Sequence, residues 1–273
     1  MRRVRAGGFE ITALVDAHGS FGTYDELFDI PGDRDRREWK ASFPELSEGD
    51  RWVVPFGAYL VTGGSFTALI DTGVGPPPGE PDFLPDRQGW LPERLSALGI
   101  SRDDIDLVFL THHHSDHIGW NVRRSEPFFP KARYVTGREA WTWTLTNRTE
   151  EFILGQLLPL EDAGVVDLID DGTTIASGLQ AVSTPGHYPG HLSVRIGRGR
   201  DRATLLGDVA VHPMQISVPE ISYAFDTDAS RATATREEFI ATLHDGELAL
   251  CNHYPGGGLG RIVHGDEPRW EPL

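Results

Sequence analysis

The sequence predicts a mixed α/β fold of the α+β kind, and two observations lead to this prediction. Short runs of apolar and β-branched residues, which are typical of strands, follow one another in blocks along the chain. Few segments with helical periodicity interrupt these blocks, so a regular alternation of strand and helix is not expected. With 273 residues and a hydrophobic fraction of 39%, the chain is long enough to bury a core. We expect one domain over residues 1–273.

The individual elements follow from where the apolar runs begin and end. Gly63-Gly64 separates two such runs and predicts a hairpin. The predicted strands are residues 8–17, 53–62, 66–71, 105–110, 133–136, 165–169, 180–183, 192–196, 203–207, 247–251 and 261–264. The predicted helices are residues 91–98, a segment that starts near Asp116, residues 138–146, and residues 228–243 with Asp226 or Thr227 as the cap. The Pro- and Gly-rich stretch 73–85 is predicted to be a loop.

Residues 19–50 differ in composition from the rest of the chain. They are rich in Asp, Glu, Arg and Gly, with scattered aromatic residues at Phe21, Tyr24, Phe28, Trp39 and Phe43. This composition predicts an extended N-terminal surface arm or insertion rather than a core element. Such an arm could join two copies of the chain into a homodimer, and its aromatic residues could wall a substrate pocket.

The charge and the cysteine content exclude several classes of partner. The formal net charge is −16, whereas nucleic acids and anionic membranes bind clustered Lys and Arg, so neither is expected as a partner. The sequence has no run of 18 apolar residues, and its basic N-terminus lacks the apolar segment of a signal peptide. Cys251 is the single cysteine, and we expect it to pack in the core as a small apolar residue. Without a partner for a disulfide, it favours a reducing, cytoplasmic location.

The densest group of candidate metal ligands is the segment THHHSDH at residues 111–117. His112, His114, Asp116 and His117 in this segment follow the spacing H-x-H-x-D-H. The segment begins directly after a predicted buried strand, and a corner between a strand and a helix can gather several side chains at one point. A run of histidines could also form a solvated turn, but this position and the acidic residue favour metal ligands.

Three further candidate ligands follow later strands: His187, Asp208 and His253. A carboxylate directly after an apolar strand is costly to desolvate without a cation. Five histidines and two aspartates suffice for two ions that share one carboxylate, so we expect two divalent metal ions per chain. Zinc is favoured, with iron, manganese and cobalt as alternatives. We expect His113, which points away from its neighbours on any regular backbone, and His191 to have structural or packing roles.

These motifs resemble those of the metallo-β-lactamase-fold hydrolases. The matching pieces, in the order of that family, are DTG at 71–73, the cluster at 111–119, TPGH at 184–187, GD at 207–208, and His253. The resemblance implies a four-layer αβ/βα sandwich with the site at one edge of its two sheets. It also implies a ligand assignment, in which Asp208 bridges a first metal on His112, His114 and His187 and a second metal on Asp116, His117 and His253.

The resemblance extends to one residue outside the ligand set and to a narrower branch of the superfamily. It implies that Asp71 orients a ligand imidazole; a turn-forming aspartate before Gly73 is the alternative. Residues 120–121, 189–191 and 225–228 look most like the lactonase and methyl-parathion-hydrolase branch.

One position departs from the pattern of the lactonases that this branch resembles. Those enzymes carry a tyrosine three residues after the bridging aspartate, where it can help to bind the substrate carbonyl. Here that position is Val211, followed by His212. We expect Trp120, Val211 and His212 near the substrate pocket, and Trp141 and Trp143 could form part of its wall.

The expected chemistry is hydrolysis by a hydroxide that bridges two metal ions. Two cations a few ångströms apart lower the pKa of a bridging water enough to hold hydroxide near neutral pH. We therefore expect an enzyme, with Asp116 and Asp208 as the carboxylates of the catalytic site, that cleaves a small neutral ester or lactone. A phosphotriesterase, which hydrolyses organophosphates, is the alternative. An iron-dependent sulfur dioxygenase is the alternative from another class, because similar ligands can hold iron.

Overall fold

The computed structural model describes residues 1–31, 40–76 and 89–273. Its first sheet has eight strands among these residues, in the order β1-β2-β5-β6-β7-β10-β11, with β4 paired to β5. The pairs β6–β7, β7–β10 and β10–β11 are parallel, and the remaining pairs are antiparallel. The strands are β1 Arg3–Ala6, β2 Phe9–Thr23, β4 Ser47–Glu48, β5 Arg51–Thr62, β6 Ala68–Ile70, β7 Leu107–Leu110, β10 Arg133–Gly137 and β11 Val166–Ile169.

The second sheet has seven strands in the described residues, in the order β12-β13-β14-β15-β17-β18-β19. Its only parallel pair among these is β15–β17. The strands are β12 Thr174–Ala176, β13 Leu179–Ser183, β14 Leu192–Arg198, β15 Asp201–Leu205, β17 Leu248–Leu250, β18 Leu259–Val263 and β19 Arg269–Pro272. Two short ribbons pair β3 Phe28–Asp29 with β16 Ser222–Tyr223, and β8 Val122–Arg123 with β9 Glu126–Pro127.

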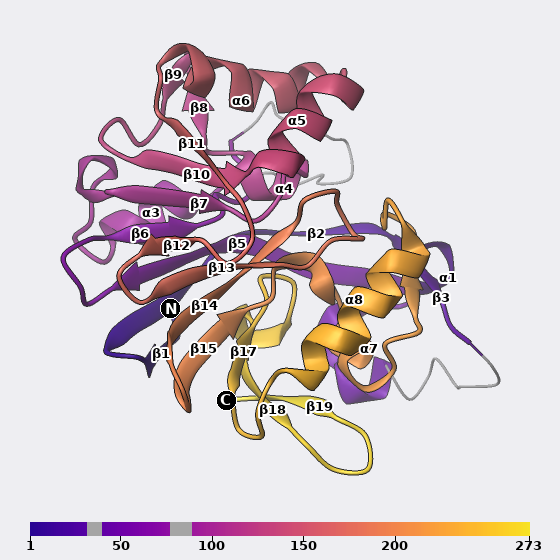
Figure 1. Ribbon diagram of the computed structural model, residues 1–273. Helices are drawn as coiled ribbons and strands as arrows, with labels where there is room; N and C mark the ends of the chain where they lie inside the picture. The colour runs from indigo at the N-terminus through magenta and orange to yellow at the C-terminus, as the bar shows by residue number, and fades with distance from the viewer. Residues whose placement is uncertain (32–39, 77–88) are drawn as a thin grey trace.

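Helices lie outside both sheets (Figure 1). The α-helices that lie wholly within the described residues are α1 Tyr24–Leu27, α3 Leu91–Ser96, α4 Ser115–Ile118, α5 Arg138–Asn147, α6 Glu151–Asp162, α7 Met214–Ser217 and α8 Ala229–Ala241. Single turns of 3-10 helix are η1 Pro44–Leu46, η2 Arg102–Asp104, η3 Gly207–Val209 and η4 Pro255–Gly257. In Figure 1, α5 and α6 lie beyond the first sheet, while α7 and α8 lie against the second.

The hydrophobic cores show that the two sheets pack face to face. Successive residues of a strand point to opposite faces of the sheet. Phe109 of β7 therefore faces the second sheet, in one buried cluster with Val194. Its neighbour Val108 faces outward, in a cluster with Leu95 of α3 and Leu157 of α6.

The outer face of the second sheet is covered in the same way. Trp270 of β19 shares a buried cluster with Phe239 of α8 and Ile216 of α7. The order of layers is therefore helix, sheet, sheet, helix (Figure 1). This arrangement confirms the predicted α/β class and the four-layer sandwich.

The prediction of a surface arm over residues 19–50 is wrong for the part that the structure describes. Strand β2 continues to Thr23 and stays paired with β5, which brings the following residues over the sheet. Tyr24, Phe28 and Leu46 are buried with Trp52 in one cluster. Tyr24 and Phe28 are thus core residues, because the strand pairing supplies an apolar surface for them. Residues 32–39, with Trp39, lie outside the described residues, and the homodimer stays a prediction.

Most predicted strands and helices lie within a few residues of the observed ones. The predicted cap of α8, Asp226 or Thr227, is wrong. The cap is Asp228, whose side chain accepts a hydrogen bond from the backbone N–H of Arg231. Helix α6 was not predicted, and part of the predicted loop, residues 77–85, lies outside the described residues.

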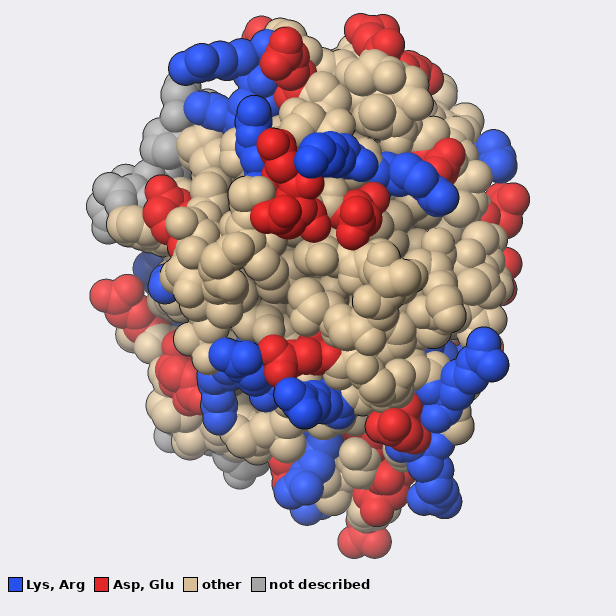
Figure 2. Space-filling view, turned by 90° about the vertical axis from the view of Figure 1, so that its left-hand side faces the viewer, with Lys and Arg blue, Asp and Glu red and all other residues tan. Residues whose placement is uncertain are grey.

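None of the helices in the described part of the chain is long and apolar enough to span a membrane. On the face shown in Figure 2, basic and acidic side chains are intermixed around a broad uncharged area. This face is therefore not uniformly acidic, although the net charge of the chain is negative.

Candidate metal centre

The candidate ligands come together because five of them lie just beyond the end of a strand, and Asp116 and His117 lie in the short helix α4 that follows β7. His112 and His114 follow β7 of the first sheet. His187 follows β13, Asp208 follows β15 and His253 follows β17, all in the second sheet. The two sheets pack against each other, so these strand ends meet at one edge of the sandwich.

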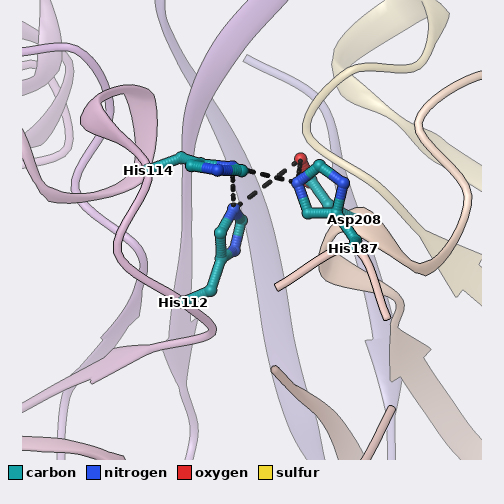
Figure 3. A group of neighbouring side chains, drawn as sticks. All are labelled: His112, His114, His187 and Asp208. Atoms are coloured by element: carbon teal, nitrogen blue, oxygen red, sulfur yellow. Dashed lines mark hydrogen bonds and ion pairs between the residues drawn. The ribbon is translucent and has the colours of Figure 1, made fainter. Parts of the chain in front are cut away.

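The first group of side chains that could hold a metal ion consists of His112, His114, His187 and Asp208, whose ligand atoms all lie within 4.8 Å of one another. Figure 3 shows the four side chains directed toward a common point. His114 Nδ1 lies 3.0 Å from both His112 Nε2 and His187 Nε2. In a tetrahedral site with Zn–N bonds of about 2.0–2.1 Å, ligand nitrogens lie about 3.3 Å apart. The spacing is therefore close to that of a coordination shell.

The second group consists of Asp116, His117 and His253, whose ligand atoms also lie within 4.8 Å of one another. Asp208 connects the two groups. Its Oδ1 lies 3.4 Å from His117 Nε2 and 3.3 Å from His253 Nε2, whereas its Oδ2 lies 3.3 Å from His187 Nε2. The two oxygens of one carboxylate thus face different groups, which is the arrangement that a carboxylate shared by two ions requires.

The residues present fit divalent cations. His117 Nε2 and Asp208 Oδ1 are buried, and neither has a hydrogen-bond partner among the described residues. Buried polar atoms are nearly always paired, and leaving one unpaired is costly. The two atoms lie 3.4 Å from each other, and a cation bound by both would satisfy them. Imidazole and carboxylate are also donors that zinc accepts.

A hydrogen bond at Nδ1 holds each of three imidazoles so that Nε2 faces the centre. His117 Nδ1 donates to Asp71 at 2.8 Å, and His187 Nδ1 donates to Asp226 at 3.0 Å. His253 Nδ1 lies 3.1 Å from the backbone oxygen of Pro55. Such partners determine the tautomer and the orientation of a metal-binding histidine.

His191 positions the backbone of Asp208 rather than joining the ligand groups. The backbone N–H of Asp208 donates to His191 Nε2 at 3.0 Å, and His191 Nδ1 lies 2.8 Å from the hydroxyl of Thr184. A Cβ atom on Gly207 would lie 2.5 Å from His191 Nε2, and the φ of Gly207 is 57°. Glycine is therefore needed before Asp208 both for its backbone conformation and for the close approach of this imidazole.

Burial and neighbouring charges act differently on the pKa values of the histidines. Burial, followed by the effect of His117, lowers the pKa of His112 well below its usual value, so that this imidazole is neutral, as a ligand must be. Burial opposes protonation of His187 too, but the hydrogen bonds with Asp208 and Asp226 outweigh it and raise its pKa to about 9. Metal binding at His187 would therefore displace a proton.

A cavity of about 170 Å³ opens onto both groups. One side of it presents candidate ligands, and another side presents apolar and aromatic side chains. Its lining among the described residues consists of Phe21, His114, Asp116, Arg148, Ile153, His187, Asp208, Tyr223, Phe225 and His253. A compact and partly apolar molecule would fit this space.

Trp120, Val211 and His212, which were expected near the pocket, do not line this cavity. Trp120 is buried, and its indole N–H donates to Asp16 at 3.1 Å. Val211 lies in a buried apolar cluster. His212 is fully buried, with its ring centroid 5.7 Å from that of Phe28. The segment after Asp208 turns inward, so it adds to the core instead of the pocket.

His113 has the position expected of a structural residue. Its two ring nitrogens lie 2.7 Å from the hydroxyl of Thr144 and 2.9 Å from that of Thr136. Trp141 is buried in the outer core, and Trp143 packs on Tyr188 at 4.9 Å between ring centroids. Neither tryptophan lines the cavity.

Several residues around the centre were not predicted from the sequence. Asp226 was read only as a helix cap or as part of a motif, although it holds His187 and pairs with the buried Arg236. Arg148 and Ile153 reach the cavity from the ends of α5 and α6. The apolar spacing of Ile153, Leu157 and Leu160 is a helical signal that could have found α6. No local signal marks Arg148 as a residue of the cavity.

The fold and the two ligand groups define a class of metal-dependent hydrolases, and a comparison with known families agrees. The model of the metallo-beta-lactamase superfamily matches residues 58–266. The chain belongs to this superfamily, so the expected metal-dependent hydrolase is confirmed at the level of the class.

The relatives of this chain include lactonases. The N-acyl homoserine lactonase AiiB of Agrobacterium fabrum is 30% identical over 160 residues, which cover 46% of this chain and 56% of that protein. The N-acyl homoserine lactonase AiiA of Bacillus thuringiensis subsp. kurstaki is 25% identical over 234 residues, which cover 78% of this chain and 87% of that protein. The solved structure of AidC, a dizinc quorum-quenching lactonase, is 23% identical to this chain and superposes on it with a TM-score of 0.83. The superposition covers 100% of this chain and 97% of AidC, so the two proteins share the fold.

Proposed function

We propose that this chain is a binuclear metal-dependent hydrolase that cleaves a small neutral ester or lactone. Two divalent ions, with zinc as the proposed metal, would be held by the two ligand groups, and Asp208 would bridge them. The first ion would lie on His112, His114 and His187, and the second on Asp116, His117 and His253.

The observation that carries this proposal is the placement of the two oxygens of Asp208. They face separate groups at distances of 3.3–3.4 Å from three imidazoles. Asp116 and Asp208 also line the cavity that a substrate would enter. The names of the lactonase relatives, one of them described as a dizinc enzyme, favour a lactone among the possible esters.

The residues of the chain suggest how the reaction proceeds. A pair of such ions, when bound, activates water and polarises a carbonyl or phosphoryl oxygen. The water oxygen bonds to the carbonyl carbon, the ester C–O bond breaks, and a water proton ends on the leaving oxygen. Asp116 lines the cavity and is placed to carry this proton. Asp71 and Asp226 keep the imidazoles of His117 and His187 in position throughout.

A phosphotriester is the second candidate substrate. Val211 lies in the core, so it offers no hydroxyl to a substrate carbonyl. Stabilisation of the developing charge by the ions serves a phosphoryl oxygen as well as a carbonyl oxygen. We nevertheless expect carbonyl substrates to be preferred.

Comparing kcat/KM for a γ-lactone, a phenyl ester and a dialkyl aryl phosphate tests this order. We expect the lactone or the ester to be hydrolysed fastest. A preference for the phosphate of about 100-fold, which corresponds to about 2.7 kcal/mol in transition-state binding, would reverse the expected order of substrates.

Elemental analysis should find two zinc ions per chain. Finding one iron and no zinc, with oxygen consumption on a persulfide, would instead place the protein among the sulfur dioxygenases.

A further inference from the structure

Arg236 is the one charged residue on the buried face of helix α8. The buried residues of this helix lie on one side of it at helical spacing, and they are Ala232, Arg236, Phe239 and Ile240. The side chain of Arg236 is only 1% exposed. Burial of a guanidinium is costly unless acceptors surround it, so its partners show what this side chain holds in place.

The guanidinium of Arg236 joins three separate stretches of the chain. Its Nε donates to the backbone oxygen of Val209 at 2.7 Å, and its Nη1 donates to those of Pro219 at 2.6 Å and Ile221 at 2.8 Å. Its Nη2 donates to Asp226 Oδ2 at 3.5 Å. Four acceptors around one planar group require the rigid fork of donors that arginine has and lysine lacks.

Two of these acceptors lie next to candidate ligands of the first group. Val209 directly follows Asp208 in the turn η3. Asp226 faces Arg236 with Oδ2, whereas its Oδ1 accepts the hydrogen bond from His187 Nδ1 at 3.0 Å. The side chain of Asp226 is 1% exposed. Loss of the guanidinium would leave this carboxylate buried without its cationic partner, and would change how firmly it holds the imidazole.

The start of α8 also holds the turn that carries His187. The backbone N–H of Thr227 donates to the backbone oxygen of His187 at 3.0 Å. A Cβ atom on Gly186 would lie 2.3 Å from the backbone nitrogen of Ala232, so the helix packs directly against this turn. Arg236 lies one helical turn beyond Ala232 on the same face, and it fixes the helix relative to η3.

The imidazoles of the second ligand group have supports of their own. His117 is held by Asp71, and His253 by the backbone oxygen of Pro55. In the described part of the chain, no hydrogen bond or ion pair connects Arg236 with either imidazole. A change at Arg236 should therefore affect the first group more than the second.

We infer that Arg236 is a positioning residue for the first metal ion. Through Asp226 it sets the orientation of His187, and through the backbone after Asp208 it sets the place of the shared carboxylate. Arg236 itself contacts neither an ion nor a substrate. This inference rests on the proposed function, because it requires two ions, and it makes the affinity for one of them depend on a buried residue outside both ligand groups.

The test measures zinc binding to the metal-free protein by competition with a chelator of known affinity. We expect Arg236→Met, which keeps the aliphatic stem, to weaken the binding of one zinc ion by about 10–100-fold and of the other by less than about threefold. With one equivalent of zinc, ¹⁵N NMR of the imidazoles should show metal on His117 and His253 and none on His187. Arg236→Lys should be intermediate, because it keeps the charge beside Asp226 and loses the fork of donors.

Arg202→Met is the matched control. Arg202 pairs with the buried carboxylate of Glu247 at 2.7 Å, and it lies at the opposite end of β15 from Asp208. Its loss also leaves a buried carboxylate without its arginine, but in a place with no printed contact to the candidate ligands. We expect Arg202→Met to lower the melting temperature and to leave both zinc affinities unchanged.

Thermal unfolding of the metal-free variants shows which of them fold, and Arg236→Lys decides the question if Arg236→Met does not. A folded Arg236 variant that binds both zinc ions as tightly as the wild type, or that loses both equally, would overturn the positioning role and leave the proposed hydrolase intact. A matching loss of one zinc ion in Arg202→Met would overturn it too, because the effect would then be one of general destabilisation. If the wild-type protein binds fewer than two metal ions, the proposed function fails, and this inference fails with it.

Discussion

The carboxylate of Asp71 accepts a hydrogen bond from His117 Nδ1 at 2.8 Å and thereby turns His117 Nε2 toward Asp116 and Asp208. The same carboxylate accepts the backbone N–H of Thr111 at 2.8 Å, at the start of the segment that carries His112. The φ of Asp71 is 61°, a left-handed conformation that aspartate tolerates better than most residues. One buried side chain thus connects the end of β6 to both candidate ligand groups.

Replacement of Asp71 by alanine should lower activity or metal affinity by about 10–100-fold. The imidazole of His117 would lose the partner that holds its orientation, while all seven candidate ligands would remain. Measuring kcat/KM together with zinc affinity checks this prediction. Unchanged values in the folded variant would show that Asp71 is only a turn residue.

Asp208→Ala should cost at least roughly 100-fold more activity than His113→Ala, because it removes the carboxylate that faces both groups. His113 is paired with the hydroxyls of Thr136 and Thr144 and lies outside both ligand groups, so its loss should lower stability more than chemistry. Metal content and kcat/KM of both variants provide the measurement. Similar losses at the two positions would contradict the ligand assignment.

Removal of metal by a chelator should abolish activity and lower the melting temperature. Without cations, Asp116 and Asp208 stay buried near each other, and the ligand that stabilised the native state is lost. Thermal unfolding before and after chelation, followed by addition of zinc, measures the effect. Full activity in protein shown to be free of metal would rule out the proposed mechanism.

Glu247 provides a pH-dependent test away from the centre. Burial alone would raise its pKa, but hydrogen bonds from Arg202, from the backbone of His244 and from Thr204 outweigh burial and hold it below 4.5. The folded protein therefore binds this proton less readily than the unfolded chain does. The resulting stabilisation is complete above about pH 4.5 and is lost as the pH falls through the lowered folded pKa.

We expect Glu247→Gln to lower the free energy of unfolding by about 1–3 kcal/mol at neutral pH, and by less in acid. Urea denaturation at about pH 7 and about pH 3.5 measures the difference. Glu271→Gln is a matched control, because the pair of Glu271 with Arg269 is exposed and should contribute less than about 0.5 kcal/mol. An equal loss for Glu247→Gln at both pH values would contradict the ion-pair explanation.

Much of the fold was predictable because it depends on local patterns. The continuous apolar run before His112 predicted a buried strand, and β7 lies there. Helix α6 was missed although its apolar spacing is regular. Composition wrongly predicted that Tyr24 and Phe28 lie on the surface. Whether these aromatic residues are buried depends on the pairing of β2 with β5, which composition does not show.

By itself, the sequence determined which seven side chains could meet, because candidate ligands at the ends of apolar strands are brought to one edge when the strands form sheets. Only the tertiary structure decided which oxygen of Asp208 faces which group, that Asp226 holds His187, and that Arg148 enters the cavity while Trp120 and Val211 do not. These relationships join segments far apart in the chain. They depend on which sheets and helices pack against each other, and no local pattern in the sequence specifies those partners.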